Sequence, residues 1–392
     1  MTPPAQPRRA PRYQTPGGGL RGALAGAALG TVLALAGWGV VRAAHGDVAR
    51  ETGAAIRQRF GPWAMPAVLV LTVLSAWLVI AWHELGHLIA GAMARLRFRT
   101  YILGPLRVER DVSTGRVVAR FNRELGTWGG MAGSYPTDAR DLSRRVAMLL
   151  AGGPLASLVL AAVAFGALAA LRTGPITRGL VAVTGLFSLG IGAVTLLPMR
   201  GSDGGRLLRL RRGGPAAERE AAVFGILGLL TSGARPRDWP PALADTAVAV
   251  PDDSTEDALA TLLAYEHVLD VRDYARAERL TARLAEIRDA LPAALRGPAA
   301  LEEAFVEAHI RRNPARARAL LAAIPTQGTG IRPGARARVE AAVAFAEGDA
   351  ARGRTLMQQA IADSPAAMPY TRTVLEELLG EMEATLGASP VN

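Results

Sequence analysis

The chain has 392 residues, of which 50% are apolar and only 5% aromatic, an unusual composition for one soluble globule. Its 45 basic and 34 acidic residues give a net charge of +11, and every base is arginine. These arginines cluster beside apolar runs rather than on one folded face, which argues against a nucleic-acid partner and favours a lipid bilayer. Because the chain has no cysteine, disulfides and thiolate metal sites are excluded, and a bound metal would need imidazole and carboxylate ligands.

The N-terminal part combines a tail with the first of several apolar stretches. Residues 1–19 are basic and rich in proline and glycine, so we expect them to be disordered. The apolar stretches that follow are each long enough to cross a bilayer as a helix, which takes roughly 20 residues. Their bounds are about 22–41, 62–94, 146–171 and 179–199. The first could instead be a signal peptide, although it exceeds the usual apolar signal core of about 7 to 15 residues.

The segment between the second and third stretches has the pattern of a β-hairpin. Apolar and polar residues alternate in 97–108 and again in 116–121, on either side of the turn sequence from Asp111 to Gly115. We therefore expect a β-hairpin region at 97–121, within a membrane domain that covers residues 20–213. Prolines and rising polarity then predict a linker over residues 214–253.

Residues 254–392 are rich in alanine and have the pattern of a soluble α-helical domain. Turn signals at Asp273, Asn313 and Asp349 are separated by 40 and 36 residues, close to the tetratricopeptide period of about 34. The region resembles tetratricopeptide repeats, and a generic α-helical array is an open alternative. Such a repeat-like domain would offer a surface to a protein partner.

The expected fold is mainly α. It is a polytopic membrane helix bundle of about four spans, with an inserted β-hairpin region and a C-terminal soluble α-helical repeat-like domain. Arginine-rich segments after the second and fourth spans place both chain termini in the cytoplasm, although the basic loop at 42–59 fits this orientation poorly. The abundance of alanine, glycine and arginine indicates a bacterial host. We therefore expect a multi-pass protein of the bacterial inner membrane.

The second apolar stretch contains the sequence His83-Glu84-Leu85-Gly86-His87. A helix here places the two histidines on one face, one turn apart, so that both can bind the same metal ion. A glutamate at this depth is costly in lipid, and ionisable residues there are usually functional. The alternative is that His83 and Glu84 only mark the inner end of the span and that His87 is a surface group.

A catalytic zinc usually has three protein ligands and one position for water, so two histidines predict a third ligand elsewhere. Asp203 is the best candidate, because it follows the fourth apolar stretch, which crosses in the same direction as the second. Gly204 and Gly205 would allow close backbone approach there. The alternative is an ordinary turn aspartate in a glycine-rich loop.

Three motifs in this order resemble those of the site-2 protease family of intramembrane zinc metalloproteases, over about residues 60–210. They are His83–His87, the Gly-Gly-Pro-Leu-Ala-Ser run that ends at Ser157, and the segment from Leu196 to Arg206. The resemblance implies one zinc ion per chain, bound by His83, His87 and Asp203. It also implies that Glu84 is the general base and that the substrates are membrane proteins.

Two positions depart from that family. Ser157 and Thr195 stand where the family usually has asparagine. Both keep a hydroxyl group, which could donate a hydrogen bond to the scissile carbonyl or hold an unwound substrate. These residues are therefore candidate substrate or oxyanion contacts.

The expected function is that of a zinc-dependent intramembrane endopeptidase in regulated intramembrane proteolysis. The departures at Ser157 and Thr195 motivate the main alternative, a catalytically weak or inactive membrane scaffold with a structural zinc site and partner-binding helical repeats. A soluble-type peptidase tethered by helices fits less well, because the metal residues continue from the apolar stretches themselves. A transporter is a further, weaker alternative. The expected partners are a membrane-protein substrate, a protein bound by the C-terminal domain and the lipid bilayer.

Overall fold

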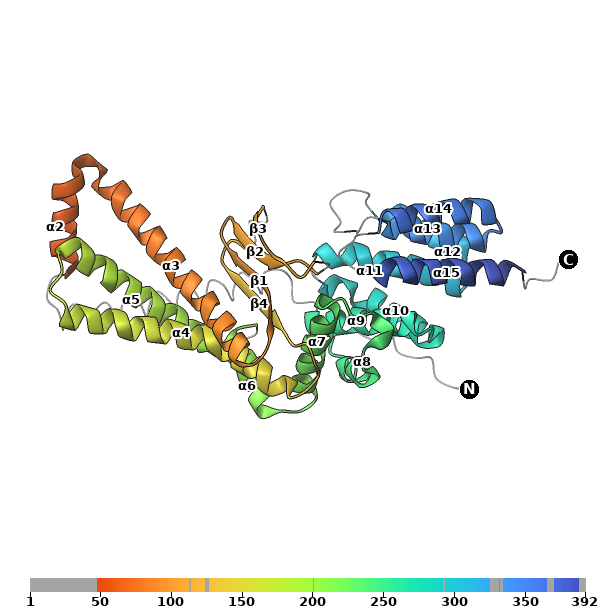
Figure 1. Cartoon of the computed structure of the whole chain (residues 1–392), viewed down its shortest axis with the longest axis horizontal. Coiled ribbons are helices and arrows are strands. Elements are labelled where there is room, and N and C mark those ends of the chain that lie inside the picture. Colours follow the sequence, from red (N-terminus) through yellow and green to blue (C-terminus); the bar gives the residue numbers. More distant parts are fainter. Residues whose placement is uncertain are drawn as a thin grey trace, which may run out of the picture. The chain divides into compact units, whose positions relative to one another are not determined.

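The computed structural model describes residues 48–112, 114–123, 127–199, 201–291, 293–324, 331, 334–364 and 370–387. The expected N-terminal tail and the first expected span at 22–41 lie outside the described residues. Those described are mainly helical and include one four-stranded sheet (Figure 1). The chain divides into two compact units, Met1–Gly86 with Gly153–Gly204, and His87–Gly152 with Gly205–Asn392.

Three of the described helices are long and apolar enough to cross a membrane. They are α3 (Ala64–Met93), α4 (Leu142–Ala170) and α5 (Pro175–Leu196). Their positions agree with the expected spans at 62–94, 146–171 and 179–199. On α3, many large apolar side chains are more than a third exposed, which suits a lipid environment better than water. These include Leu69, Val73, Leu78, Trp82, Ile89 and Met93.

Within the first unit, helix α2 (Val48–Phe60) packs against the start of α5. A Cβ atom at Gly179 would lie 2.4 Å from the Cγ2 atom of Thr52, so only glycine allows the two helices to approach this closely. The hydroxyl of Thr52 donates a hydrogen bond of 2.8 Å to the carbonyl of Pro175. These contacts fix the N-terminal end of α5.

The sheet belongs to the second unit and contains β1 (Arg97–Leu103), β2 (Leu106–Arg110), β3 (Val117–Phe121) and β4 (Met131–Tyr135). The strand order is β3-β2-β1-β4, and all neighbouring pairs are antiparallel. The expected turn after Asp111 is confirmed, since it joins β2 to β3. The expectation of one strand at 97–108 is wrong, because Gly104 turns the chain with a φ of 53° and splits the segment into β1 and β2.

The segment 214–253, expected to be a linker, is largely helical. It contains α7 (Pro215–Thr231), the short helix η3 (Pro236–Asp238) and α8 (Pro241–Ala247), which follow α6 (Asp203–Arg212). The prolines stand in the first turn of these helices, where no amide donor is needed. Buried Ile226 and Trp239 pack with Leu263 of α9, so this segment folds together with the helical domain.

The remaining helices form three consecutive pairs followed by one final helix, drawn from green-blue to dark blue in Figure 1. They are α9 (Thr255–Asp270), α10 (Tyr274–Ile287), α11 (Ala293–Phe305), α12 (Pro314–Ala323), α13 (Ala335–Ala346), α14 (Ala350–Ala362) and α15 (Tyr370–Gly387). The structure has a turn between helices at each of the three expected positions.

All three turns have the same construction. The side chains of Asp273, Asn313 and Asp349 each cap the following helix by accepting a hydrogen bond of 3.0 to 3.1 Å from the amide three residues later. The residue before each cap has a positive φ, 66° at Arg272, 55° at Arg312 and 84° at Gly348. The internal repetition expected from the turn spacing is therefore present in the structure as a repeated turn.

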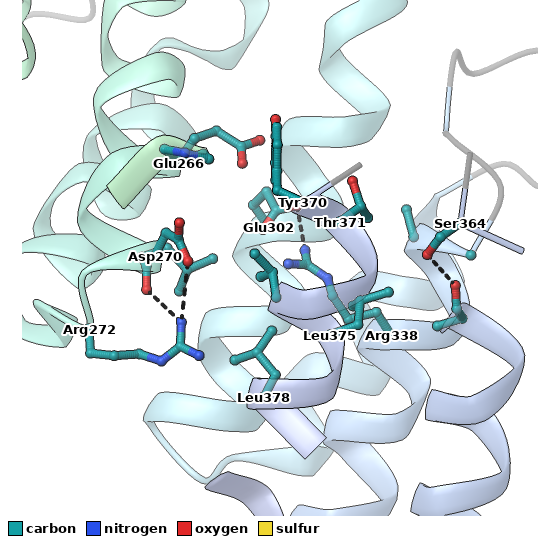
Figure 2. A pocket seen from close by; sticks show the side chains of 16 residues that line it. Glu266, Asp270, Arg272, Glu302, Arg338, Ser364, Tyr370, Thr371, Leu375 and Leu378 are labelled. Atoms are coloured by element: carbon teal, nitrogen blue, oxygen red, sulfur yellow. Dashed lines mark hydrogen bonds and ion pairs between the residues drawn. The ribbon is translucent and has the colours of Figure 1, made fainter. Parts of the chain in front are cut away.

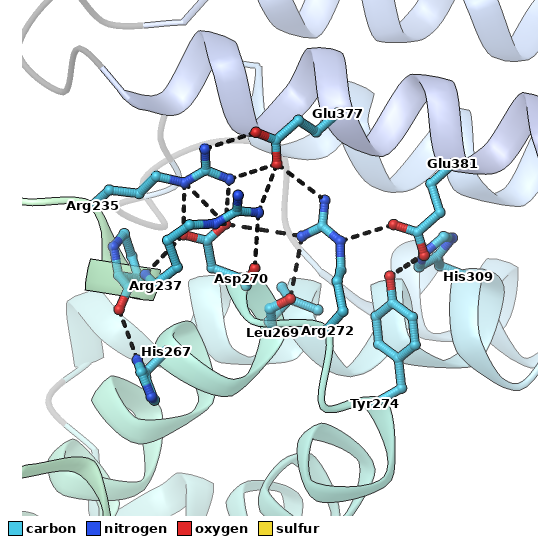
Figure 3. Close-up of polar contacts among 11 residues, drawn as sticks. Arg235, Arg237, His267, Leu269, Asp270, Arg272, Tyr274, His309, Glu377 and Glu381 are labelled. Atoms are coloured by element: carbon cyan, nitrogen blue, oxygen red, sulfur yellow. Dashed lines mark hydrogen bonds and ion pairs between the residues drawn. The ribbon is translucent and has the colours of Figure 1, made fainter. Parts of the chain in front are cut away.

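A network of ion pairs joins the last helix, α15, to α9 and to η3 (Figure 3). At its centre is Asp270, whose side chain is 4% exposed and lies 2.7 Å from the guanidinium of Arg235. The same guanidinium lies 2.7 Å from Glu377 of α15. Hydrogen bonds from Arg235 hold the pKa of Glu377 at about 2, below its usual 4.5. The stabilisation from Glu377 is therefore complete above pH 4.5 and is lost as the pH falls towards 2.

We expect Asp270→Asn to destabilise the protein by about 3 kcal/mol, because it removes the charge that several arginines share at a buried position. The measurement is thermal or denaturant unfolding of the purified protein. The matched control is Asp363→Asn, a change at an exposed position that should stay within about 0.5 kcal/mol. Equal stability of the two variants would contradict this role of Asp270.

Candidate metal centre

Two histidines and one aspartate come together in the structure. His83 and His87 lie one turn apart on α3 and are 5% and 8% exposed, and Asp203 begins α6. One ligand atom from each of the three residues lies within 4.8 Å of the others. The Nε2 atom of His83 lies 3.5 Å from the Oδ2 atom of Asp203. This largely buried group could hold a metal ion.

Asp203 is positioned by a tight turn at the end of α5. The hydroxyl of Ser202 donates to the carbonyls of Leu197 and Met199, at 2.6 and 2.9 Å. A Cβ atom at Gly204 would lie 2.0 Å from the carbonyl oxygen of Leu196, which no side chain can tolerate. The expected role of Gly204 is therefore confirmed, since the backbone after Asp203 packs directly against the backbone of α5.

A backbone carbonyl orients His87. The Nδ1 atom of His87 lies 2.7 Å from the carbonyl oxygen of Leu149 in α4. Because a carbonyl oxygen only accepts, Nδ1 must carry the hydrogen, and the lone pair is then on Nε2. Gly91 helps α3 approach this part of α4, since a Cβ atom there would lie 3.1 Å from the Leu149 side chain.

A side chain orients His83. The Nδ1 atom of His83 lies 2.9 Å from the hydroxyl oxygen of Ser157, which is fully buried in α4. The preceding residue on α3, Trp82, donates a hydrogen bond of 2.9 Å to the carbonyl of Ala156. Contacts of this kind fix the ring of a metal-binding histidine and raise its affinity for the metal. The sequence suggested a substrate contact for Ser157 and missed this one, which depends on the packing of two helices.

The two other candidate residues, Glu84 and Thr195, lie on α3 and α5. Glu84 is half-buried on α3 between the histidines. The hydroxyl of Thr195 donates to the carbonyls of Ile191 and Gly192 in its own helix, at 2.9 and 3.3 Å. The structure thus engages Thr195 within α5, and its expected contact with substrate stays a prediction.

The donor set limits the metals that fit. Two imidazoles and one carboxylate suit a borderline divalent ion such as Zn²⁺, and three protein ligands are the usual number at a catalytic zinc. The other two described histidines have contacts elsewhere, since His267 Nδ1 lies 2.7 Å from the carbonyl of Pro236 and His309 Nε2 lies 3.4 Å from Glu381. His45 lies outside the described residues.

A cavity of about 90 Å³ in the helical domain is a weaker candidate site than the metal centre (Figure 2). Four of its charged side chains form two ion pairs. Arg338 lies 2.5 Å from Glu302 and stacks on the ring of Phe305, and Arg272 lies 3.9 Å from Asp270. These side chains are paired with one another within the fold, so the histidines of α3 are the better candidates for a functional site.

We expect Ser157→Ala to weaken zinc binding by about 10- to 100-fold, because His83 loses the hydrogen bond that orients its ring. The measurement is competition of the purified protein with a zinc chelator of known affinity. Ser75→Ala is the matched control, since Ser75 is a buried serine on the same helix as His83 that bonds only to the carbonyl of Leu71 in the described structure. If both variants bind zinc as the unchanged chain does, Ser157 does not support His83.

Comparisons of the chain with models of protein families, with curated proteins and with solved structures gave no match. The metal-binding group and the helices that carry it are therefore the features from which a function can be inferred. Chemistry is in any case better inferred from a site than from a fold.

Proposed function

We propose that the chain is a zinc-dependent intramembrane endopeptidase that cleaves membrane proteins. One observation carries the proposal. Two buried histidines and a carboxylate come within 4.8 Å of one another, and the histidines lie on a helix that is long and apolar enough to cross a bilayer. Ionisable groups at such a depth are costly and are usually functional.

Each residue of the group has a defined task in this proposal. A zinc ion held by His83, His87 and Asp203 supplies Lewis acidity that activates water and polarises the scissile carbonyl. The histidines would bind the ion through Nε2, because their Nδ1 atoms are hydrogen-bonded in the protein. Glu84 takes the proton from the attacking water and passes it to the leaving nitrogen.

The substrate must be unwound before cleavage, because peptide groups in a helix are already hydrogen-bonded. An extended segment can be held by pairing with the edge of a sheet. Strand β3 is such an edge, and its residues Val117 and Phe121 are 50% and 68% exposed. We propose that β3 accepts the substrate segment as an added strand.

The proposal includes a location and a partner. The protein is a multi-pass protein of a bacterial inner membrane, with both termini in the cytoplasm. The helical domain that follows residue 254 binds a protein partner or the substrate and regulates access to the metal centre. The three apolar helices support association with a membrane, and the repeated turns at Asp273, Asn313 and Asp349 support a repeat-like helical domain, the kind of domain that binds proteins.

A scaffold with a structural zinc is the second candidate. It is favoured by the hydroxyls of Ser157 and Thr195, which are engaged within the chain rather than offered to a substrate. In this reading Glu84 has no catalytic task.

The test is a comparison of membrane proteins in cells that contain the unchanged chain or the Glu84→Gln variant. A pair of fragments that appears only with the unchanged chain names the substrate and supports the protease. Identical fragment patterns in the two strains, with zinc bound to both proteins, would favour the scaffold.

A further inference from the structure

A basic cavity of about 410 Å³ lies where α3 ends and α4 begins. We use the name basic cavity for the space lined by Met93, Arg95, Arg140, Arg144, Arg145 and Met148. Two aspartates, Asp138 and Asp141, also line it, so four arginines face two carboxylates and the lining has an excess of positive charge. None of these residues belongs to the metal centre.

One of the four arginines has a structural task. The guanidinium of Arg145 donates to the two carbonyls that directly follow α3, at 2.9 Å to Ala94 and 2.7 Å to Arg95. A cation at the C-terminus of a helix is stabilised by the helix dipole. Arg145 also lies 2.9 Å from Asp138, which in turn lies 3.3 Å from Arg140. Hydrogen bonds from Arg140 lower the pKa of Asp138, so this carboxylate stays ionised and is shared between two arginines.

Two arginines of the cavity remain without a counter-charge. Arg95 and Arg144 are exposed, and among the described residues neither makes an ion pair or a side-chain hydrogen bond. Arg95 stands at the end of α3 with a φ of 55°, and Arg144 lies in the first turn of α4. The cavity therefore offers two guanidinium groups to an anion, and phosphate oxygens match the geometry of guanidinium donors.

The apolar side of the cavity continues along α3. Met93 is 72% exposed, and Ile89, one turn earlier on the same face, is 49% exposed. Met148 of α4 lines the cavity together with Met93. A free anion would gain nothing from these side chains, whereas the chain of a lipid could cover them.

We propose that the basic cavity binds the phosphate headgroup of an anionic phospholipid, with Arg95 and Arg144 as the main phosphate contacts and Met93 against the acyl chain. Basic pockets at the ends of membrane helices bind anionic headgroups in this way. The proposal requires α3 and α4 to lie in a bilayer, but it is independent of proteolysis. Because Met148 precedes the Leu149 carbonyl that orients His87, a bound lipid would also stiffen the helix that supports the metal centre.

The test uses the full chain in detergent and native mass spectrometry with phosphatidylglycerol or phosphatidylcholine of the same acyl chains. We expect phosphatidylglycerol to bind more tightly. The double variant Arg95→Gln/Arg144→Gln should lower its affinity by about 25-fold, a factor of roughly five per arginine. It should lower the affinity for phosphatidylcholine by less, because the choline cation of that lipid offsets the phosphate charge. Arg144→Gln alone, an exposed change with no described contact to lose, should give about a fivefold loss.

The matched control is Arg59→Gln/Arg172→Gln, which removes the same charge from exposed positions beyond the opposite ends of α3 and α4. It should keep the full preference for phosphatidylglycerol. Equal losses in the control and test variants, or equal binding of the two lipids, would overturn the proposal in favour of arginines that only anchor the helices. Glycerol phosphate at millimolar concentration should not displace the lipid, and displacement would assign the cavity to a soluble phosphate. If only the lipid site is wrong, the test and the control double variants should both keep zinc and substrate cleavage. Failure of the lipid test would then leave the proposed protease untouched.

Discussion

The Glu84→Gln variant is expected to keep about one zinc ion per chain while cleavage of a membrane substrate falls by roughly 10²- to 10⁴-fold. Glutamine has the size and polarity of glutamate but cannot accept the proton of the attacking water. Glu84 is not one of the three residues that form the metal-binding group, so its charge is not required to hold the ion. The measurements are zinc content by atomic emission and the rate at which a substrate fragment appears, taken from the same preparations.

The matched control for this variant is Glu51→Gln, the same chemical change at an exposed position of α2. It should leave both measurements unchanged. Normal cleavage by the Glu84→Gln protein would remove the general base from the mechanism. If a zinc-depleted protein then also loses activity, the metal would remain necessary for cleavage and the base would be a group other than Glu84.

The second large effect is expected from His87→Ala. This change removes one of the three ligands, so zinc affinity should fall by more than the roughly 100-fold that loss of a supporting contact costs. Cleavage should be lost together with the metal, in contrast to the behaviour of Glu84→Gln. Asp203→Ala should resemble His87→Ala, although two remaining ligands can hold some zinc. The measurement is chelator competition, with the Ser75→Ala protein as the reference.

Retention of zinc at full affinity by both His87→Ala and Asp203→Ala would show that the three residues do not form the metal site. Loss of zinc in His87→Ala but not in Asp203→Ala would assign the third ligand to another group. The two variants thus separate the part of the site that lies on α3 from the part that lies on α6.

The sequence predicted the metal-binding group because its main signals are local. Helical periodicity alone places His83 and His87 on one face, and an uninterrupted apolar run identifies α3. The link to Asp203 required a further step, the assumption that two spans cross in the same direction. Gly204 was a useful signal, because a glycine beside a candidate ligand indicates close backbone approach, and the structure has that approach.

The parts that sequence reasoning missed depend on contacts between distant segments. Strand β4 is short and consists largely of small residues without alternation, and it becomes a strand only by pairing with β1. Prolines such as those at 215 and 241 are typical of a linker, but the same residue also begins helices. The contact between Ser157 and His83 joins residues 74 positions apart, so no local pattern contains it.

The hydrogen-bond partners that orient the two histidines of the metal centre differ in their sensitivity to mutation. The support of His83 is the hydroxyl of Ser157, which a single codon change can delete. The support of His87 is the main-chain oxygen of Leu149, which every amino acid at that position supplies. A substitution of Ser157 can therefore remove the hydrogen bond that orients the ring of His83. The hydrogen bond that orients the ring of His87 depends on the backbone of α4 and not on the identity of a side chain.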